Sequence, residues 1–326
     1  MLRYTALRVA QAVAVLWAAF TVSFVVLFLL PSDPVTIAID SSAGATPVDA
    51  AAVAELQARY GLDRPVWEQY WTSLTHAVRG DFGYSITTGR SVTSAIADAL
   101  PSTLALAGLA LALASGAGVA LAFAATYTRS PRIAALLRAL PPLGVAVPTF
   151  WVGLVLLQLF SFGLPIFPAF GEHGVAALVL PAVTLALPTG AVVAQVLASS
   201  LTATLREPFV DATRAKGASR WRVHTRHAVR LSIIPAFTIS GVLVGNLLAG
   251  SVVVETVFSR AGVGRLTQTS VLAQDIPVVQ GIVVLTALVY VVVNLLVDLV
   301  YPWLDPRITL RGAAPERDAP KEKSVV

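Results

Sequence analysis

The amino-acid sequence predicts an all-α integral membrane protein with six transmembrane helices. Of its 326 residues, 56% are hydrophobic and 13% are charged, and the mean hydropathy is +0.77. Such values are typical of multi-span membrane proteins. Six apolar stretches are long enough to cross a bilayer. They cover residues 9–30, 101–128, 139–162, 175–200, 231–254 and 278–300.

The loops that hold most of the Lys and Arg residues are expected to be cytoplasmic, because positive residues are retained on that side of the membrane. The N-terminus, residues 126–138, residues 206–230 and the C-terminal tail together contain 17 of the 23 Lys and Arg residues. This distribution predicts that both termini lie in the cytoplasm. It also accounts for the net charge of +5 without a nucleic-acid partner. The absence of cysteine excludes disulfide bonds and thiol chemistry.

Residues 1–31 are predicted to form the first transmembrane helix. The apolar run at residues 9–30 is longer than the core of about 7 to 15 residues found in signal peptides, so we expect it to remain as a span. Residues 32–99 are more polar and are predicted to form an extracytoplasmic segment with short helices.

Two helices are expected in this extracytoplasmic segment. Thr46 begins a capping-box pattern with Pro47 at the first helical position, and Gly61 can end that helix. A second helix follows Pro65 and has an aromatic face. This face could bind a ligand, but such faces more often lie at the lipid interface or pack on the spans. It consists of Trp67, Tyr70, Trp71, Leu74 and Val78.

The second, third and fourth spans are rich in small and apolar residues. In the second span, Ser115, Gly116 and Gly118 let neighbouring helices approach closely. The third span follows a short cytoplasmic loop with three Arg residues. In the fourth span, Pro181 and Pro188 remove backbone hydrogen bonds and predict a kink.

Polar residues within the spans are candidates for the translocation pathway. Amides in spans also form hydrogen bonds between helices, and that role is the more common one. Asp298 lies near the cytoplasmic end of the sixth span and is expected to have a basic partner or to reach the interface. The charged tail at residues 306–326 is expected to be cytoplasmic and disordered. The pathway candidates are Gln158, Gln195, Asn246 and Asn294.

The most informative stretch is the basic segment at residues 206–230, between the fourth and fifth spans. It contains seven Lys or Arg and two acidic residues, so it must lie outside the hydrocarbon core. Pro208 suits a first helical position, and Gly217 suits a left-handed C-cap. Ser219 can cap a second short helix. A solvated loop that only sets the orientation of the spans is the simpler alternative.

Residues 211–217, Asp-Ala-Thr-Arg-Ala-Lys-Gly, resemble the Glu-Ala-Ala signature of permease subunits of bacterial ATP-binding-cassette (ABC) importers. Asp211 and Thr213 replace the consensus Glu and second Ala. Other stretches are similar to the oligopeptide, dipeptide and nickel permease family, and to its B-type subunit. They are Gly-Asp-Phe-Gly at 80–83, Pro-Thr-Phe-Trp at 148–151, Val-Glu-Thr-Val-Phe at 254–258, Gly-Val-Gly-Arg-Leu at 262–266 and Pro-Val-Val-Gln-Gly at 277–281.

This resemblance implies a type I ABC importer permease fold, with the transmembrane domain at residues 100–305. It also implies that residues 206–230 form a cytoplasmic coupling loop that docks on a separate ATPase subunit. The residues to which this role is carried over are Asp211, Ala212, Thr213, Ala215, Lys216, Gly217, Ala218, Ser219 and Arg220.

By the same resemblance, the chain forms half of a translocation pathway for di- or oligopeptides in the bacterial cytoplasmic membrane. The implied partners are a second homologous permease subunit, two ATPase subunits, an extracytoplasmic substrate-binding protein and membrane lipid. ATP and Mg would bind to the ATPase subunits, and this chain is expected to bind no cofactor or metal. Nickel chelates or another small solute are the alternative cargo.

Two other functional classes fit the sequence less well. A secondary transporter would show inverted repeats or ionisable relays at mid-membrane, and neither is evident. A membrane enzyme would need a nucleophile and a base, or a metal centre. His224 and His227 are expected on a basic solvated face rather than at a metal, because no third ligand is near. The sequence has no Walker A motif, so another chain would hydrolyse ATP.

Overall fold

The computed structural model describes residues 2–29, 63–171 and 174–304, and every regular element in these ranges is a helix. Four helices are long and apolar enough to cross a membrane, and two bent pairs bring the number to six if each pair is one span. The predicted all-helical class with six apolar segments agrees with this architecture. The helix expected after Thr46 and the tail at 306–326 lie outside the described residues. The four long helices are α1 (Leu2–Leu29), α5 (Val92–Tyr127), α8 (Ala176–Thr204) and α14 (Ile276–Leu304).

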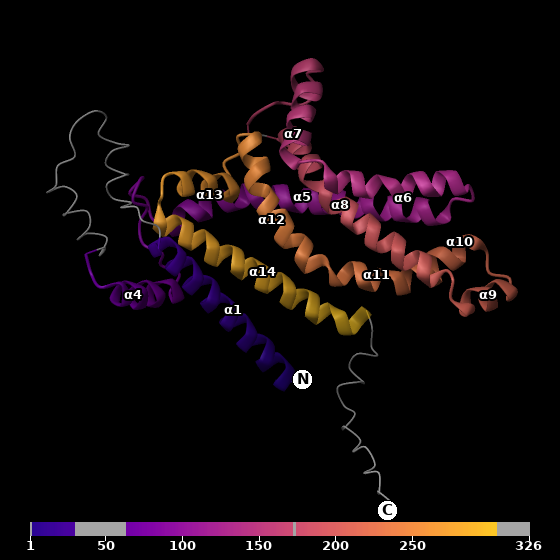
Figure 1. Cartoon of the computed structure of the whole chain (residues 1–326), viewed down its shortest axis with the longest axis horizontal. Helices are drawn as coiled ribbons and strands as arrows, with labels where there is room; N and C mark the ends of the chain where they lie inside the picture. Colours follow the sequence, from indigo (N-terminus) through magenta and orange to yellow (C-terminus); the bar gives the residue numbers. More distant parts are fainter. Residues whose placement is uncertain (1, 30–62, 172–173, 305–326) are drawn as a thin grey trace, which may run out of the picture.

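In Figure 1, α1, α5 and α14 all reach the left side of the molecule; α5 and α8 extend to the right side, whereas α1 and α14 have their other ends in the lower middle. α4 (Val66–Val78) and α13 (Val263–Leu272) lie at one end, which we call the α13 end. α9 (Pro208–Ala215) and α10 (Arg220–Arg222) lie at the other, which we call the α9 end.

α5 and α8 pack closely through small residues. A Cβ atom on Gly118 would lie 2.8 Å from the carbonyl oxygen of Gly190 and 2.8 Å from Cβ of Val193, so a larger residue does not fit at this crossing. Gly116, on the same helix, faces open space. The predicted close approach of helices is therefore confirmed at Gly118 and wrong at Gly116. The buried core around this crossing includes Leu106, Ala110, Ala114, Leu185, Leu247 and Phe258.

The predicted third span at 139–162 is not one straight helix. α6 (Pro131–Ala146) and α7 (Thr149–Leu157), which continues as the π-helix η1 (Gln158–Gly163), meet at an angle of 97°. The bend lies at Pro148, which has no N–H group and holds the preceding Val147 in an extended conformation. Much of the predicted loop at 126–138 is also helical, because α6 begins at Pro131.

The predicted fifth span at 231–254 is also a bent pair. α11 (Val229–Thr238) and α12 (Ser240–Val257) meet at 51°. In contrast, α8 continues as a single helix through both of its prolines.

The second span begins earlier than predicted, because α5 starts at Val92 and contains Pro101 in its interior. The boundary between the segments predicted at 32–99 and 100–305 therefore falls inside a helix. The additional turns are stabilised by burial, since Val92 and Ile96 pack with Val278 and Ile282 of α14.

Contacts with α1 confirm two expectations about polar and aromatic residues. Arg8 of α1 and Asp298 of α14 form an ion pair at 2.9 Å, which supplies the predicted basic partner. Tyr70 of α4 packs against Phe24 of α1, with ring centroids 5.3 Å apart in edge-on geometry. Trp17 of α1 donates a hydrogen bond of 3.0 Å to the Tyr70 hydroxyl. The aromatic face of α4 therefore packs on a span at Tyr70.

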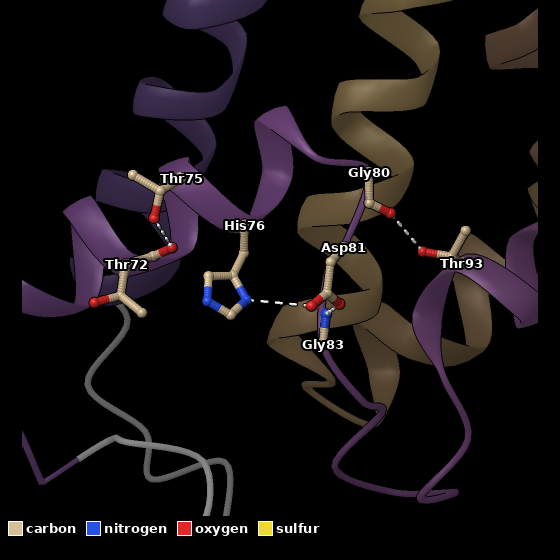
Figure 2. A network of polar contacts seen from close by, with 7 residues as sticks. All are labelled: Thr72, Thr75, His76, Gly80, Asp81, Gly83 and Thr93. Carbon is tan, nitrogen blue, oxygen red and sulfur yellow. Dashed lines mark hydrogen bonds and ion pairs between the residues drawn. The ribbon is translucent and has the colours of Figure 1, made fainter.

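A tight turn follows α4 and leads into α5, as Figure 2 shows. Gly80 and Gly83 have φ values of +78° and +75°, which glycine adopts without strain. The Asp81 carboxylate accepts a hydrogen bond from the Gly83 amide at 2.9 Å and lies 3.2 Å from Nδ1 of His76. The Thr93 hydroxyl donates to the Gly80 carbonyl at 2.8 Å and so ties the turn to α5.

Candidate functional site

The basic segment at 206–230 begins with α9, a short helix that is closed at both ends. Pro208 occupies the first helical position. At the other end, Gly217 has a φ of +85°. Its amide donates to the Arg214 carbonyl at 2.8 Å, and the Ala218 amide donates to the Thr213 carbonyl at 3.2 Å. These two bonds form a Schellman motif, so the predicted C-cap at Gly217 is confirmed.

The second helix of the segment begins as predicted but is not short. The Ser219 hydroxyl accepts a hydrogen bond from the Arg222 amide at 3.3 Å, which is the expected N-cap. α10 then passes without a break into the π-helix η2 (Val223–Ala228) and on into α11. The segment that follows Ser219 is therefore rigidly joined to the bent fifth span.

Most of α9 is exposed to solvent. Val210 is its buried anchor, at 1% exposure, and Thr213 is half-buried. Asp211 and Arg214 form an exposed ion pair at 3.6 Å, which contributes little to stability. Among the residues assigned to coupling, Ala218 and Arg220 are half-buried. The exposed ones are Asp211, Ala212, Ala215, Lys216, Gly217 and Ser219.

An aromatic cluster joins this segment to the end of α5. The ring of Trp221 lies 5.3 Å from Phe123 and 5.9 Å from Tyr127, with both pairs edge to face. The guanidinium of Arg220 lies 4.8 Å above the Tyr127 ring, a favourable cation–π geometry. We call the set Phe123, Tyr127, Arg220, Trp221 and His224 the aromatic clamp.

His224 is buried at 2% exposure, so its expected place on a solvated face is wrong. Its ring lies 5.1 Å from Phe123 and 5.3 Å from Tyr127. Nε2 of His224 lies 3.1 Å from the Thr126 hydroxyl. The segment is π-helical here, which changes the angular position of side chains relative to an α-helix. The prediction of a regular α-helix therefore put His224 on the exposed face.

A second polar cluster lies at the α13 end and was not assigned a role from sequence. Glu255 is fully buried. Its carboxylate accepts hydrogen bonds from the Thr103 hydroxyl at 2.7 Å and from the Arg265 amide at 3.1 Å. The Thr103 hydroxyl also accepts from the Val263 amide at 2.8 Å. This cluster joins α5, α12 and the first turn of α13.

Two further charged residues are buried at the α13 end. Arg260 donates to the Ser102 hydroxyl at 3.0 Å and is 4% exposed. Asp275 is 1% exposed and accepts hydrogen bonds from the Thr87 hydroxyl at 2.7 Å and the Ile86 amide at 3.2 Å. Asp275 thereby holds the loop that precedes α5 against the start of α14. Both residues lie next to motifs that the sequence singled out, but their partners are distant in sequence.

The four pathway candidates lie on different elements: η1, α8, α12 and α14. Gln158, Gln195 and Asn246 are exposed. Asn294 donates to the Tyr290 carbonyl of its own helix at 2.8 Å, and its side chain lies against Gly241. Within the described residues no hydrogen bond joins any two of the four. Their shared role in a pathway stays a prediction.

Two clefts lie between the helices. One, of about 450 Å³, is almost wholly apolar and lies between α1, α5, α12, α13 and α14. The other, of about 420 Å³, lies between α5, α6 and α8 near the α9 end and is lined by Gln195 and two arginines. In residues 2–29, 63–171 and 174–304, no cluster of three His, Cys, Asp or Glu residues suits a metal ion.

The described residues form an all-helical bundle with up to six spans and an exposed helix set between two of them, an arrangement compatible with the transmembrane subunit of a transporter. Residues 114–310 match the family described as binding-protein-dependent transport system inner membrane component. Residues 1–107 match the family described as the N-terminal part of the membrane component of binding-protein-dependent transport systems. The chain belongs to this permease family.

Curated relatives match almost the full length of the chain. A putative peptide transport system permease protein of Brucella abortus (strain 2308) is 34% identical over 310 residues, which cover 92% of this chain and 97% of the relative. A glutathione transport system permease protein of Salmonella typhimurium (strain LT2) is 34% identical over 308 residues, which cover 94% of this chain and 99% of the relative.

Family membership settles several points of function. The chain is a multi-pass inner-membrane permease subunit of a transport system that depends on a binding protein. It lacks ATPase activity and binds no cofactor, because the ATPase subunits of the system use the ATP. ATPase and binding-protein partners follow from the same family.

Proposed function

We propose that the chain is the permease subunit of an ABC importer for small peptides, with residues 206–230 as its coupling loop. The cargo is supported by relatives named as a peptide permease and a glutathione permease. The observation that carries the coupling role is α9, a helix capped at Pro208 and Gly217 that exposes most of its surface.

The two ends of the segment give α9 the rigidity that coupling requires. α8 leads into it through a short turn at 205–207, and the turn at 216–219 joins it to α10, η2 and α11, which run on without a break. A displacement of α9 by an ATPase subunit would therefore move the fourth and fifth spans as rigid bodies. Asp211, Lys216 and the small residues between them form the docking surface, whereas Thr213, Ala218 and Arg220 hold the segment's own fold.

The ion pair between Arg8 and Asp298 supports the proposed topology. It brings the start of α1 close to the last turns of α14, and we propose that both termini lie on one side of the membrane. The concentration of Lys and Arg assigns that side, with the α9 end, to the cytoplasm. A second homologous permease forms the other half of the pathway, to which Gln158, Gln195, Asn246 and Asn294 contribute.

The coupling role is tested by co-purification of the assembled transporter in mild detergent, with the wild type, Gly217→Arg and Gly217→Asn compared. A Cβ atom at Gly217 meets no other atom within 4 Å, so a side chain there causes no clash. Its effect comes from strain at the φ of +85° and from the bulk that it adds to the docking surface. Asn tolerates this conformation better than Arg, and we expect the ATPase subunits to remain with the Asn variant and to be lost from the Arg variant. Normal uptake by Gly217→Arg would refute the coupling assignment.

The cargo is tested by uptake of labelled dipeptides, glutathione and nickel chelates in vesicles that contain the complete transporter. Peptide uptake that requires the binding protein and ATP supports the proposed cargo. Uptake of nickel chelates alone would replace it, and uptake driven by an ion gradient without the ATPase subunits would identify a secondary transporter.

A further inference from the structure

The cleft between α5, α6 and α8 has a cationic rim and an apolar wall. Arg138 of α6 and Arg206, just after α8, both line it. Within the described part of the chain neither arginine forms an ion pair. No acidic residue lines the cleft. The volume of about 420 Å³ falls within the range of roughly 300 to 1,000 Å³ that is usual for small-molecule sites.

The wall of the cleft suits a hydrocarbon chain. Leu121 of α5, Leu137 of α6 and Ala194 of α8 line it, together with other small apolar residues and the polar side chains of Gln195, Ser199 and Thr202. The Ser199 hydroxyl is exposed, and no partner for it is seen in the described residues, so it can donate a hydrogen bond beside the arginines. A suitable ligand would have an anionic head and an apolar tail.

The position of the cleft matches the depth of a lipid headgroup. It is built from the last turns of α5 and α8, and Arg206 lies two residues before α9. If the α9 end is cytoplasmic, the arginines face the headgroups of the inner leaflet. Basic pockets between spans at this level bind anionic lipid headgroups.

We propose that this cleft binds an anionic phospholipid of the cytoplasmic leaflet, with its phosphate between Arg138 and Arg206 and an acyl chain along Leu121 and Leu137. The bound lipid joins α6 to the start of the coupling segment. The inference rests on the proposed orientation of the chain, and it goes beyond the transport role. Arg138 and Arg206 recognise the charge of the phosphate. The apolar wall favours a lipid over a free phosphate ion, because only the lipid has an acyl chain to contact it.

The test is lipid retention by the intact transporter. The transporter is purified from membranes, exchanged into nanodiscs of phosphatidylglycerol and phosphatidylcholine in equal amounts, and analysed by native mass spectrometry after release. Wild type is compared with the double variant Arg138→Gln/Arg206→Gln. The matched control is Arg129→Gln/Arg132→Gln, which removes the same charge from exposed positions just before α6 and in its first turn that do not line the cleft.

We expect wild type and the control to retain phosphatidylglycerol in preference to phosphatidylcholine. In the double variant this preference should fall about 10- to 30-fold, since two basic residues near an anionic headgroup are removed. Arg138→Lys/Arg206→Lys keeps both charges and should restore retention. Equal loss in the control, or unchanged retention in the Gln double variant, would overturn the proposal.

Two competitors identify what the cleft recognises. Displacement of the lipid by millimolar inorganic phosphate would show a free-anion site, and displacement by a dipeptide would assign the cleft to the transport pathway. Either result overturns the lipid assignment. Because the readout is bound lipid, its failure leaves the coupling and cargo assignments untouched, and their failure leaves lipid retention measurable.

Discussion

Thr103 donates a hydrogen bond of 2.7 Å to the buried carboxylate of Glu255. The same carboxylate accepts from Arg265, the third residue of α13. A Cβ atom on Gly262, the N-cap position of α13, would overlap this carboxylate. Glu255 therefore occupies the place of the capping side chain that Gly262 lacks. The cap of α13 comes from α12, and α5 holds it in position.

Thr103→Val should destabilise the protein by about 1 to 3 kcal/mol, because it removes a buried donor to a carboxylate and leaves the Val263 amide without its acceptor. Thermal unfolding in detergent measures the change. Thr286→Val is the control, since within the described residues the hydroxyl of the exposed Thr286 bonds only the Ile282 carbonyl of its own helix. Equal shifts in the two variants would show that the bond to Glu255 has no special role.

Gly118→Ala should destabilise the crossing of α5 and α8, whereas Gly116→Ala should be neutral or slightly stabilising. The added methyl group meets the Gly190 backbone in the first case and open space in the second. Overpacking costs typically about 1 to 3 kcal/mol, and Ala is favoured over Gly in a helix. The unfolding midpoints of the two variants check this pair, and a stable Gly118→Ala variant would contradict the packing.

Trp221→Ala should loosen the coupling segment from α5. Loss of the ring removes edge-to-face contacts with Phe123 and Tyr127, each worth about 0.5 to 1.5 kcal/mol. Hydrogen exchange should therefore rise several-fold in both η2 and the last turn of α5. Trp67→Ala, which removes an exposed tryptophan of α4, should leave exchange at these sites unchanged. Faster exchange in η2 alone would show that the clamp does not hold α5.

The turn after α4 should weaken in acid. The hydrogen bond from the Gly83 amide lowers the pKa of Asp81 below its ordinary 3.8. The unfolded chain then binds more protons than the folded one, so the stabilisation is complete above that ordinary pKa and is lost as pH falls through the lower folded pKa. Asp81→Asn should unfold at a slightly lower temperature than wild type at pH 6, and this difference should shrink as pH falls below 3.8 and disappear below the lowered pKa of the folded state. Asp63→Asn serves as the control, and a difference that does not change with pH would refute this account.

Local rules were sufficient for much of the coupling segment. Pro208, Gly217 and Ser219 each occupy the predicted capping position, because caps depend on neighbouring residues in the chain. A basic partner for Asp298 was one of two expectations, since a charge near the end of a span needs a partner or must reach the interface. The identity of that partner, Arg8, required the structure.

The remaining features depend on contacts that no local pattern encodes. The burial of His224 follows from a π-helical turn and the rings of a helix about 100 residues earlier in the sequence. The role of Glu255 as a cap requires knowledge of where α5 lies. The bend at Pro148 had a local signal, a proline inside an apolar run, but Pro181 and Pro188 have the same signal and α8 continues through them.

α5 contains 36 residues, so it is about 54 Å long at 1.5 Å per residue. Thr103, about a third of the way along α5, is fastened to α12 and α13, and Thr126 and Tyr127 are fastened to the coupling segment at the far end. No proline interrupts the helix between these positions. This part of the helix is about 34 Å long and acts as a stiff lever: a tilt of about 5° around one position displaces the other by about 3 Å. The two ends of the molecule therefore move together: a small tilt of α5 at the aromatic clamp displaces Glu255 at the other end.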